Sequence, residues 1–400
     1  MKPTSSLKGS NFFSFLKRAG LLLTAFAIGI LIFLLLTWMG KKNKGPLDDL
    51  LMTAENKISQ MEKNVLGRDE RKTRSAALNW LHKYRANKTM FGTLDTILLG
   101  AFDDNTAESY ESIIDLEDSI HTTFSIISIY TAWGSKKTQV FPQLRVQAIS
   151  DLGSIPMITW EPWMNDFNEE EFPVLANKKD KNKDGMKAIV SGNFDSYIDK
   201  WAKAARDFGS PFFLRFGHEM NDPYRYPWGP QNNKPEDFIV AWRYLVNRFN
   251  AIGAKNVIWI WSPHPAYLNY PQFYPGPDYA DWVGVTTLNY GTVATWSQWW
   301  TFEEIFKKFY DSVSLYKKPM MLTEFGSLPV GGNRAQWFKE ALEPLPEKYP
   351  LLKGLVFYHA TSDNTTTYKS LDWSFEDDKS SSEAVIKAIH NWHRIKKTVP

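Results

Sequence analysis

The feature that most constrains the fold of this chain is a series of eight short apolar segments, each followed by a more polar one. The apolar segments are rich in β-branched and aromatic residues and are bounded by turn-forming residues, which is the pattern of buried strands. The eight predicted strands are 94–102, 124–133, 155–163, 211–219, 256–264, 281–290, 319–326 and 354–360.

Amphipathic segments fill the intervals between these strands. Segment 235–254 has Pro235 at its start and Gly253 near its end, residue types that typically begin and end a helix. Further helix-like segments are 196–208, 302–316 and 382–394. Strands that alternate with helices predict an α/β fold in which helices cover a parallel sheet. Eight strands favour a closed (β/α)8 TIM barrel over an open doubly wound sheet, and no glycine-rich phosphate loop follows the first strand.

The N-terminal part of the chain differs in composition from the rest. Residues 1–44 hold seven Lys or Arg and no acidic residue, whereas the remainder carries 40 basic against 44 acidic residues. The excess positive charge behind the net charge of +3 therefore lies in residues 1–44, and the rest of the chain is net negative. No nucleic-acid partner is expected. The chain has no cysteine, which excludes disulfides, thiol nucleophiles and cysteine-bound zinc.

Segment 19–40 is apolar and uncharged, and it is long enough for a bilayer-spanning helix, which needs about 20 residues. Trp38 near its end suits the membrane interface. We therefore expect a retained transmembrane helix, the alternative being a signal peptide that is cleaved on secretion. The predicted organisation is a basic tail (1–18), this helix (19–40), a helical linker (41–87) and the barrel domain (88–400).

Acidic, imidazole and aromatic side chains stand at the ends of the predicted strands. Because active sites of such barrels lie at the carboxyl ends of the strands, these residues are expected to share one rim. Flat indole faces pack on C–H-rich sugar faces, and charged groups bond to hydroxyls, so this composition predicts a sugar-binding cleft. Its candidate substrate-binding residues include Trp163, Trp261, His264 and Tyr358.

Two glutamates are the candidate catalytic pair. Glu219 ends predicted strand four and Glu324 ends strand seven, and these strands face each other across the mouth of a closed barrel. One carboxyl would act as a protonated general acid and the other as an ionised nucleophile on a glycosidic bond. Glu161 and the Asp103/Asp104 pair lack this facing geometry. A lone glutamate at a strand end is more often an ion-pair partner or a cap, so the prediction rests on the coincidence of two in one aromatic rim.

No metal and no cofactor are expected, because "HEMND" lacks the two-histidine spacing of a zinc site.

The stretch "RFGHEMN", followed by "YPWG" and by "LTEFG" about a hundred residues later, resembles glycoside hydrolase family 26 over residues 88–394. The resemblance implies a retaining (β/α)8 barrel enzyme with Glu219 as acid/base and Glu324 as nucleophile. It places Arg215 and His218 beside the two carboxylates, and Tyr290, Trp160 and Trp228 at further family positions, the two tryptophans lining the sugar subsites. In particular, the Tyr290 hydroxyl is expected to bond to the nucleophile and hold it ionised. Asn221, just after predicted strand four, is a further supporting candidate.

The chain departs from the mannanases of that family in two places. The loop "NDPYRYPWGP" after Glu219 has one tryptophan, and strand eight ends "FYHA" instead of in a tryptophan. The "YPWG" form and the later "LDWSF" are reminiscent of β-glucan-cleaving members.

These observations predict a membrane-anchored, retaining endo-β-1,4-glycanase for mannan-type polysaccharide, with β-glucan as the alternative substrate. The barrel is expected outside the cytoplasm, in the periplasm or at the cell surface, tethered to the bilayer by residues 19–40. We expect a monomer, and a raised pKa of Glu219 caused by burial and by the charge of Glu324. A competing hypothesis of another class is a catalytically silent glycan-binding protein attached to polysaccharide machinery.

Overall fold

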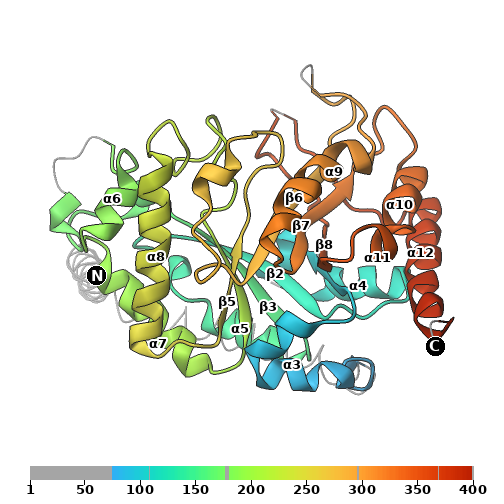
Figure 1. The fold of residues 1–400 in the computed structure, drawn as a ribbon, viewed down its shortest axis with the longest axis horizontal. Coiled ribbons are helices and arrows are strands. Elements are labelled where there is room, and N and C mark those ends of the chain that lie inside the picture. The colour runs from blue at the N-terminus through green and yellow to red at the C-terminus, as the bar shows by residue number, and fades with distance from the viewer. Residues whose placement is uncertain (1–73, 108, 176–179, 295–296, 368, 399–400) are drawn as a thin grey trace, which may run out of the picture. The chain divides into compact units, whose positions relative to one another are not determined.

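The structure is a computed structural model that describes residues 74–107, 109–175, 180–294, 297–367 and 369–398. Eight parallel strands pair in sequence order, and the last pairs with the first, so the sheet closes into a barrel (Figure 1). The predicted fold class is confirmed for the barrel. The strands are β1 Leu98–Phe102, β2 Ile126–Ala132, β3 Ile155–Glu161, β4 Phe212–Phe216, β5 Val257–Trp261, β6 Trp282–Asn289, β7 Met320–Ser327 and β8 Leu352–Tyr358.

Helices surround the barrel, as Figure 1 shows for α7 and α8 on one side and α10 and α12 on the other. Among them α8 starts with Pro235 and is followed by Gly253, whose φ of 92° is the left-handed conformation that ends many helices. The helices are α3 His82–Ala86, α4 Glu111–Ser119, α5 Gln143–Asp151, α6 Gly185–Val190, α7 Asp195–Phe208, α8 Pro235–Ile252, α9 Phe302–Val313, α10 Arg334–Leu342, α11 Leu345–Lys348 and α12 Lys379–Thr398.

The predicted membrane helix lies outside the described residues. In the part of the chain that the structure describes, no helix combines the length and the apolar character needed to cross a bilayer.

The amino-terminal end of the barrel is closed by aromatic packing. Phe91, from the 3₁₀ segment Lys88–Thr93 that precedes β1, lies edge-on to Phe213 of β4 at a ring distance of 5.2 Å. Phe213 in turn packs against Trp282 of β6 inside the barrel, at 5.2 Å. This apolar layer fills the amino-terminal half of the barrel interior. Polar side chains of the same strands are therefore confined to the half that contains the carboxyl ends of the strands.

Two predicted sugar-binding tryptophans are part of the outer core, and their assignment to the cleft is wrong. Successive strand residues point to opposite faces of a sheet. Because Thr159 points into the barrel, its neighbour Trp160 points out and packs on Trp201 of α7 at 4.5 Å. Trp261 likewise lies outside the barrel, against Tyr274 at 5.1 Å. Both indoles are fully buried.

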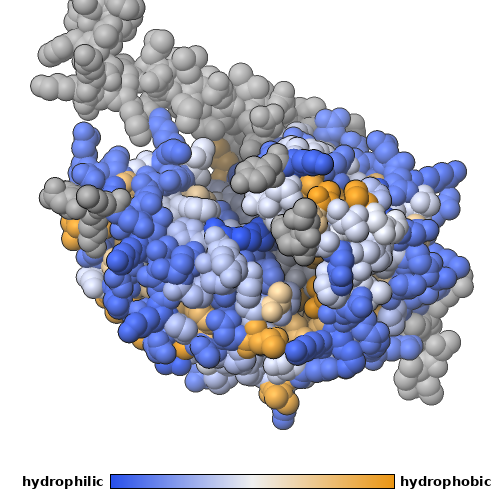
Figure 2. Space-filling model, turned by 90° about the horizontal axis from the view of Figure 1, so that it is seen from above, coloured by the Kyte–Doolittle hydropathy of each residue, from blue (hydrophilic) through white to orange (hydrophobic). Residues whose placement is uncertain are grey.

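The opposite end of the barrel is hollowed. Seen from above, this face has a depression at its centre, lined by hydrophilic residues (Figure 2).

Replacing Phe91 by alanine should lower the free energy of unfolding by about 3–5 kcal/mol, because a fully buried ring is lost and leaves a cavity. Urea-induced unfolding measures this, with Leu315→Ala as the control, since that leucine is 79% exposed and should change stability by at most about 0.5 kcal/mol. Equal effects of the two substitutions would contradict the proposed closure of the barrel.

Candidate active site

A β-bulge in β7 brings Glu324 to the barrel interior. Val285 of β6 pairs with Leu322, but the next residue, Thr286, pairs with Glu324, so Thr323 is the extra residue. A bulge breaks the in–out alternation and re-aims side chains. As a result, the side chains of both Thr323 and Glu324 reach the same arginine inside the barrel.

That arginine is Arg215 of β4, and its guanidinium is fully buried in a polar cage. It donates to Thr159 of β3 (2.9 Å) and to Thr323 of β7 (3.0 Å). One terminal nitrogen donates to both Glu324 Oε1 and the Tyr130 hydroxyl oxygen, each at 2.7 Å. Charge-assisted bonds of this length are the strong ones, so Glu324 is held as a carboxylate in a fixed orientation.

Tyr130 of β2 completes the contacts of Glu324. Its hydroxyl donates to Glu324 Oε1 at 2.7 Å. We expected that bond from Tyr290, but the Tyr290 hydroxyl lies 3.1 Å from Thr366 Oγ1. The expected Tyr290–Glu324 hydrogen bond is therefore replaced by one from the opposite side of the barrel. The physical reason is the β7 bulge, which turns the Glu324 carboxylate towards Tyr130 of β2 and Arg215 of β4.

Glu219 lies just beyond β4, which ends at Phe216 and is shorter than predicted. Its backbone is left-handed, with a φ of 52°, which is strained for a residue other than glycine. Its N–H donates to the carbonyl of Ser262 beyond β5 at 2.7 Å, and its own carbonyl accepts from Asp222 at 2.9 Å. These bonds hold the tight turn that buries the Glu219 side chain.

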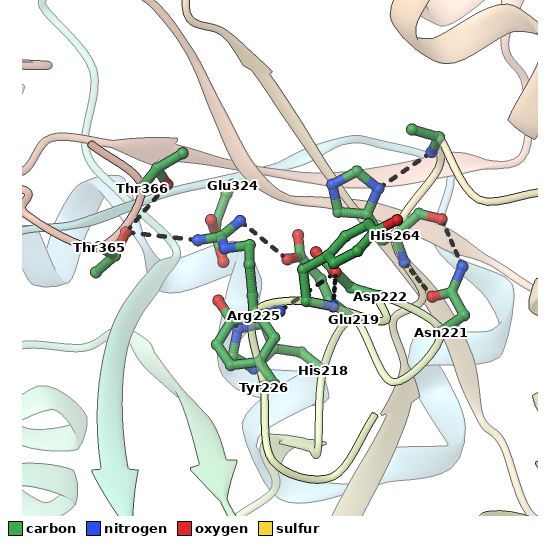
Figure 3. Close-up of polar contacts among 12 residues, drawn as sticks. His218, Glu219, Asn221, Asp222, Arg225, Tyr226, His264, Glu324, Thr365 and Thr366 are labelled. Atoms are coloured by element: carbon green, nitrogen blue, oxygen red, sulfur yellow. Dashed lines mark hydrogen bonds and ion pairs between the residues drawn. The ribbon is translucent and has the colours of Figure 1, made fainter. Parts of the chain in front are cut away.

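Arg225 is the charged partner of Glu219. Its guanidinium lies 3.3 Å from Glu219 Oε2 and 3.5 Å from Thr365 Oγ1, so it extends across the mouth between the two (Figure 3). Burial raises the pKa of the Glu219 carboxyl, but the positive charges of His264 and Arg225 outweigh burial and hold that pKa below its usual value. The raised pKa that we expected is therefore wrong for the ligand-free structure.

His218, the residue before Glu219, is buried and uncharged. Burial, and then the nearby Arg215, lower the pKa of its imidazole well below the usual value. Its Nε2 lies 3.0 Å from the Tyr226 hydroxyl, and the Trp228 indole donates to its carbonyl at 2.7 Å. Trp228 itself stacks beneath Tyr226 at 4.7 Å, so it supports the ring next to the cavity instead of contacting a sugar there.

Asn221 fixes the neighbouring loop. Its amide nitrogen donates to the carbonyls of His264 and Tyr267, each at 2.9 Å. Its amide oxygen accepts from the His264 N–H at 2.7 Å. Asn221 therefore aligns the loop after β5 with the Glu219 turn, as Figure 3 shows, and is a structural clamp.

Two cavities meet at the barrel mouth. The larger, of about 820 Å³, is lined by Glu219 and His264, and the smaller, of about 590 Å³, by Glu324. Arg225 borders both. Two predicted sugar-binding residues, Trp163 and Tyr358, line the smaller cavity, where Tyr358 stacks on Phe102 at 5.2 Å.

A third carboxyl, Glu161, also lines the smaller cavity. It ends β3 and accepts a bond from the Trp163 indole at 3.1 Å. Burial raises the pKa of the Glu161 carboxyl to about 7, although the Trp163 bond and the charge of Arg215 act in the opposite direction. A carboxyl of this kind is partly protonated near neutral pH and can both donate to and accept from sugar hydroxyls.

The remaining rival acids have structural partners. Asp103 lies 3.1 Å from His359 Nδ1, and Asp104 accepts a bond from the Ser362 hydroxyl at 2.9 Å. Both aspartates thereby tie β1 to the loop that follows β8, which also carries Thr365.

One group of possible metal ligands occurs among the described residues, formed by Glu219, Asp222 and His264. His264 Nδ1 accepts a bond from the N–H of Ala266 at 3.2 Å. That ring nitrogen is therefore occupied by the backbone of its own loop. We assign no metal to this group.

Sequence reasoning missed Tyr130, Arg225 and Tyr226. Tyr130 lies in the apolar run "FSIISIYTAW", where nothing distinguishes it from a core tyrosine. Arg225 and Tyr226 belong to the loop "NDPYRYPWGP", whose composition was visible but whose shape depends on packing against other loops.

The model of Glycosyl hydrolase family 26 matches residues 67–326 of this chain, which is more than half of it. The chain belongs to glycoside hydrolase family 26. It is therefore a glycoside hydrolase, and the resemblance found in the sequence is confirmed. The individual roles of the site residues remain predictions.

Two curated relatives are similar to this family member. Endoglucanase H of Acetivibrio thermocellus is 29% identical over 293 residues, which cover 71% of this chain and 29% of that protein. A mannan endo-1,4-beta-mannosidase of Bacillus subtilis is 23% identical over 210 residues, or 50% of this chain and 54% of that protein. The chain thus spans 29% and 54% of the lengths of these relatives.

Among solved structures, a GH26 beta-mannanase from Bacteroides ovatus superposes with a TM-score of 0.53 at 20% identity, covering 74% of this chain and 89% of that one. At that identity the likeness supports the fold alone.

The Glu161→Gln variant tests the charge state of the smaller cavity without an activity assay. Because the pKa of Glu161 is about 7 when folded and has a reference value of 4.5, the folded protein holds an extra proton between these pH values. The wild type should therefore lose stability as pH rises through this window, by on the order of 2 kcal/mol relative to the variant.

Urea-induced unfolding at several pH values between 4.5 and 7.5 measures the difference. Glu236→Gln, at an exposed position on α8, is the matched control and should give a flat difference. A flat difference for Glu161→Gln as well would contradict the raised pKa.

Proposed function

We propose that this family 26 hydrolase is an endo-acting β-1,4-glycanase that works with retention of configuration, with Glu324 as nucleophile and Glu219 as acid/base. The observation that carries the proposal is the unequal placement of the two carboxylates at one barrel mouth. Glu324 is fixed by four strands through Arg215 and Tyr130, whereas Glu219 contacts a partly exposed arginine. A nucleophile must stay ionised, and an acid/base must exchange a proton, so the environments match the assigned roles.

In the proposed reaction, Glu219 donates its proton to the glycosidic oxygen while Glu324 attacks the anomeric carbon. Glu219, now ionised, then takes a proton from the water that hydrolyses the glycosyl-enzyme. The larger cavity, on the Glu219 side, receives the leaving part of the polymer. Tyr224 (80% exposed) and Trp300 (42% exposed) offer open aromatic faces there. The smaller cavity, with Glu324, Trp163 and Glu161, holds the sugar that is transferred.

Two backbone sugars are candidates for the substrate. Mannan-type polysaccharide is the first candidate, and a mannan endo-1,4-beta-mannosidase is among the relatives. Endoglucanase H has the higher identity over a longer segment, which favours β-glucan. We further propose that residues 19–40 anchor the barrel to a membrane on its extracytoplasmic side, since polymers of this kind lie there.

The first test is the product profile of the purified protein on mannan, glucomannan, mixed-linkage β-glucan and xylan. We expect mixed oligosaccharides from mannan or β-glucan, because an endo enzyme cuts within the chain, and a newly formed reducing end that is initially the β-anomer by proton NMR. Release of a single small sugar would contradict endo action, and an initial α-anomer would contradict retention.

Glu219→Ala and Glu324→Ala separate the two roles. Glu219→Ala should lower kcat on polysaccharide by about 10²–10⁴-fold, the usual contribution of a general acid. It should still release dinitrophenol in a burst from a dinitrophenyl glycoside, whose leaving group needs no proton. Glu324→Ala should fail on both substrates yet still bind oligosaccharide in calorimetry. Identical losses on both substrates for the two variants would contradict the division of roles.

A further inference from the structure

The two arginines at the barrel mouth hold their carboxylates in different ways. The Arg215 guanidinium is fully buried and makes four bonds of 2.7–3.0 Å. The Arg225 side chain is 25% exposed, and its guanidinium makes contacts of 3.3 and 3.5 Å, at the long end of hydrogen-bond geometry. Arg215 cannot move without disrupting the barrel interior. Arg225 can leave Glu219 at a small cost in bonding.

Arg225 also occupies the position that a substrate needs. Glu219 lines the larger cavity and Glu324 the smaller one, and neither cavity includes both carboxylates. A retaining glycosidase requires both carboxylates on one sugar, with carboxyl groups about 5–5.5 Å apart. The Arg225 side chain lies between Glu219 and the Thr365/Thr366 segment, as Figure 3 shows, and borders both cavities.

We propose that Arg225 is a positioning residue that substrate displaces: it separates the two carboxylates in the free protein and leaves Glu219 when a sugar enters. The inference rests on the proposed function. Displacement removes a cation from the Glu219 carboxylate and replaces the solvated guanidinium by sugar. Glu219 then takes up a proton from solvent, and this proton is the one that it donates to the glycosidic oxygen.

The electrostatics of Glu219 support this coupling. His264 and Arg225 together hold its pKa below the usual value, so the carboxyl is ionised and unsuited to act as a general acid while Arg225 is in place. Loss of the nearby cation raises the pKa of this carboxyl, while His264, Thr286 and Arg215 continue to lower it. The charged and titratable groups that face Glu219 are His264, Arg225, Arg215, Asp222, Glu324, Tyr226, Tyr267 and Tyr290. Of these, Arg225 is the cation that borders both cavities.

The backbone around Arg225 is suited to a fixed base with a movable side chain. Asp222 Oδ1 accepts the N–H of Tyr224 at 2.7 Å and that of Arg225 at 3.3 Å. Thr365, the other contact of the guanidinium, is itself held by Asp363 at 2.6 Å. These bonds fix the backbone of the Asp222–Arg225 turn and the position of Thr365. Displacement of Arg225 is therefore confined to its side-chain torsions.

The test compares Arg225→Met, which keeps volume and removes charge, with Arg225→Lys, which keeps charge. The pH dependence of kcat/KM reports the groups of the free enzyme. On whichever glycan the wild type cleaves, the descending alkaline limb should move up by about one pH unit in Arg225→Met and stay near the wild-type position in Arg225→Lys. Arg243→Met, on the outer face of α8 away from the cleft, is the matched control.

An alkaline limb that does not move in Arg225→Met overturns the inference, whether or not KM rises. A rise in KM alone would identify Arg225 as an ordinary sugar-binding residue. If Arg225→Met is active but its alkaline limb does not move, the inference fails and the proposed function stands. If the wild type neither cleaves nor binds any of the glycans, the proposed function itself is refuted.

A second measurement does not depend on turnover. Calorimetry of oligosaccharide binding to Glu324→Gln, in buffers of different ionisation enthalpy, counts the protons taken up. Displacement predicts proton uptake on binding at mildly acidic pH with Arg225 present, and a smaller uptake in the double variant with Arg225→Met. Zero uptake in both proteins contradicts the displacement of Arg225.

Discussion

The buried ion pair between Arg215 and Glu324 is the interaction on which the rest of the site depends. It lies inside the barrel, directly above the aromatic layer around Phe213, and it draws polar groups from β2, β3, β4 and β7 to one point. A buried charge without a partner costs about 3–5 kcal/mol, so each member of this network constrains the others. The bulge in β7 is what allows two successive residues to join it.

This fixed centre explains the difference between the two sides of the cleft. Glu324 is part of the barrel itself, whereas Glu219 belongs to a strained turn that leans on the loop after β5. The loops after β4 and β8 bring in Arg225 and Thr365, which contact each other over the centre. The mouth therefore combines a rigidly held Glu324 with Arg225, the cation that we propose to be displaced, beside Glu219. This combination suits the proposed reaction, in which Glu324 stays ionised and Glu219 exchanges a proton.

The barrel could be predicted from the sequence because its determinants are local: eight apolar runs and the helix signals between them. Glu219 and Glu324 were found for the same reason, since each follows an apolar run on a strand whose place in a closed barrel is fixed by counting. The rest depended on non-local geometry. Trp160 and Trp261 look like rim residues in sequence, but in–out alternation turns them towards the helices. Two further features leave no pattern in a single sequence. One is the β7 bulge, through which Tyr130 and not Tyr290 donates to Glu324, and the other is the loop path that places Arg225 between the cavities.

In the proposed reaction, Glu324 forms a covalent bond to the sugar while Glu219 protonates the leaving group. An activated glycoside with fluorine at C2 tests it most directly, because the fluorine slows hydrolysis of the glycosyl-enzyme and lets it accumulate. We expect one sugar added per chain and, after proteolysis and mass spectrometry, a label on the peptide at Glu324. A label on Glu161 or Glu219, or steady hydrolysis of natural substrate with no adduct, would contradict it.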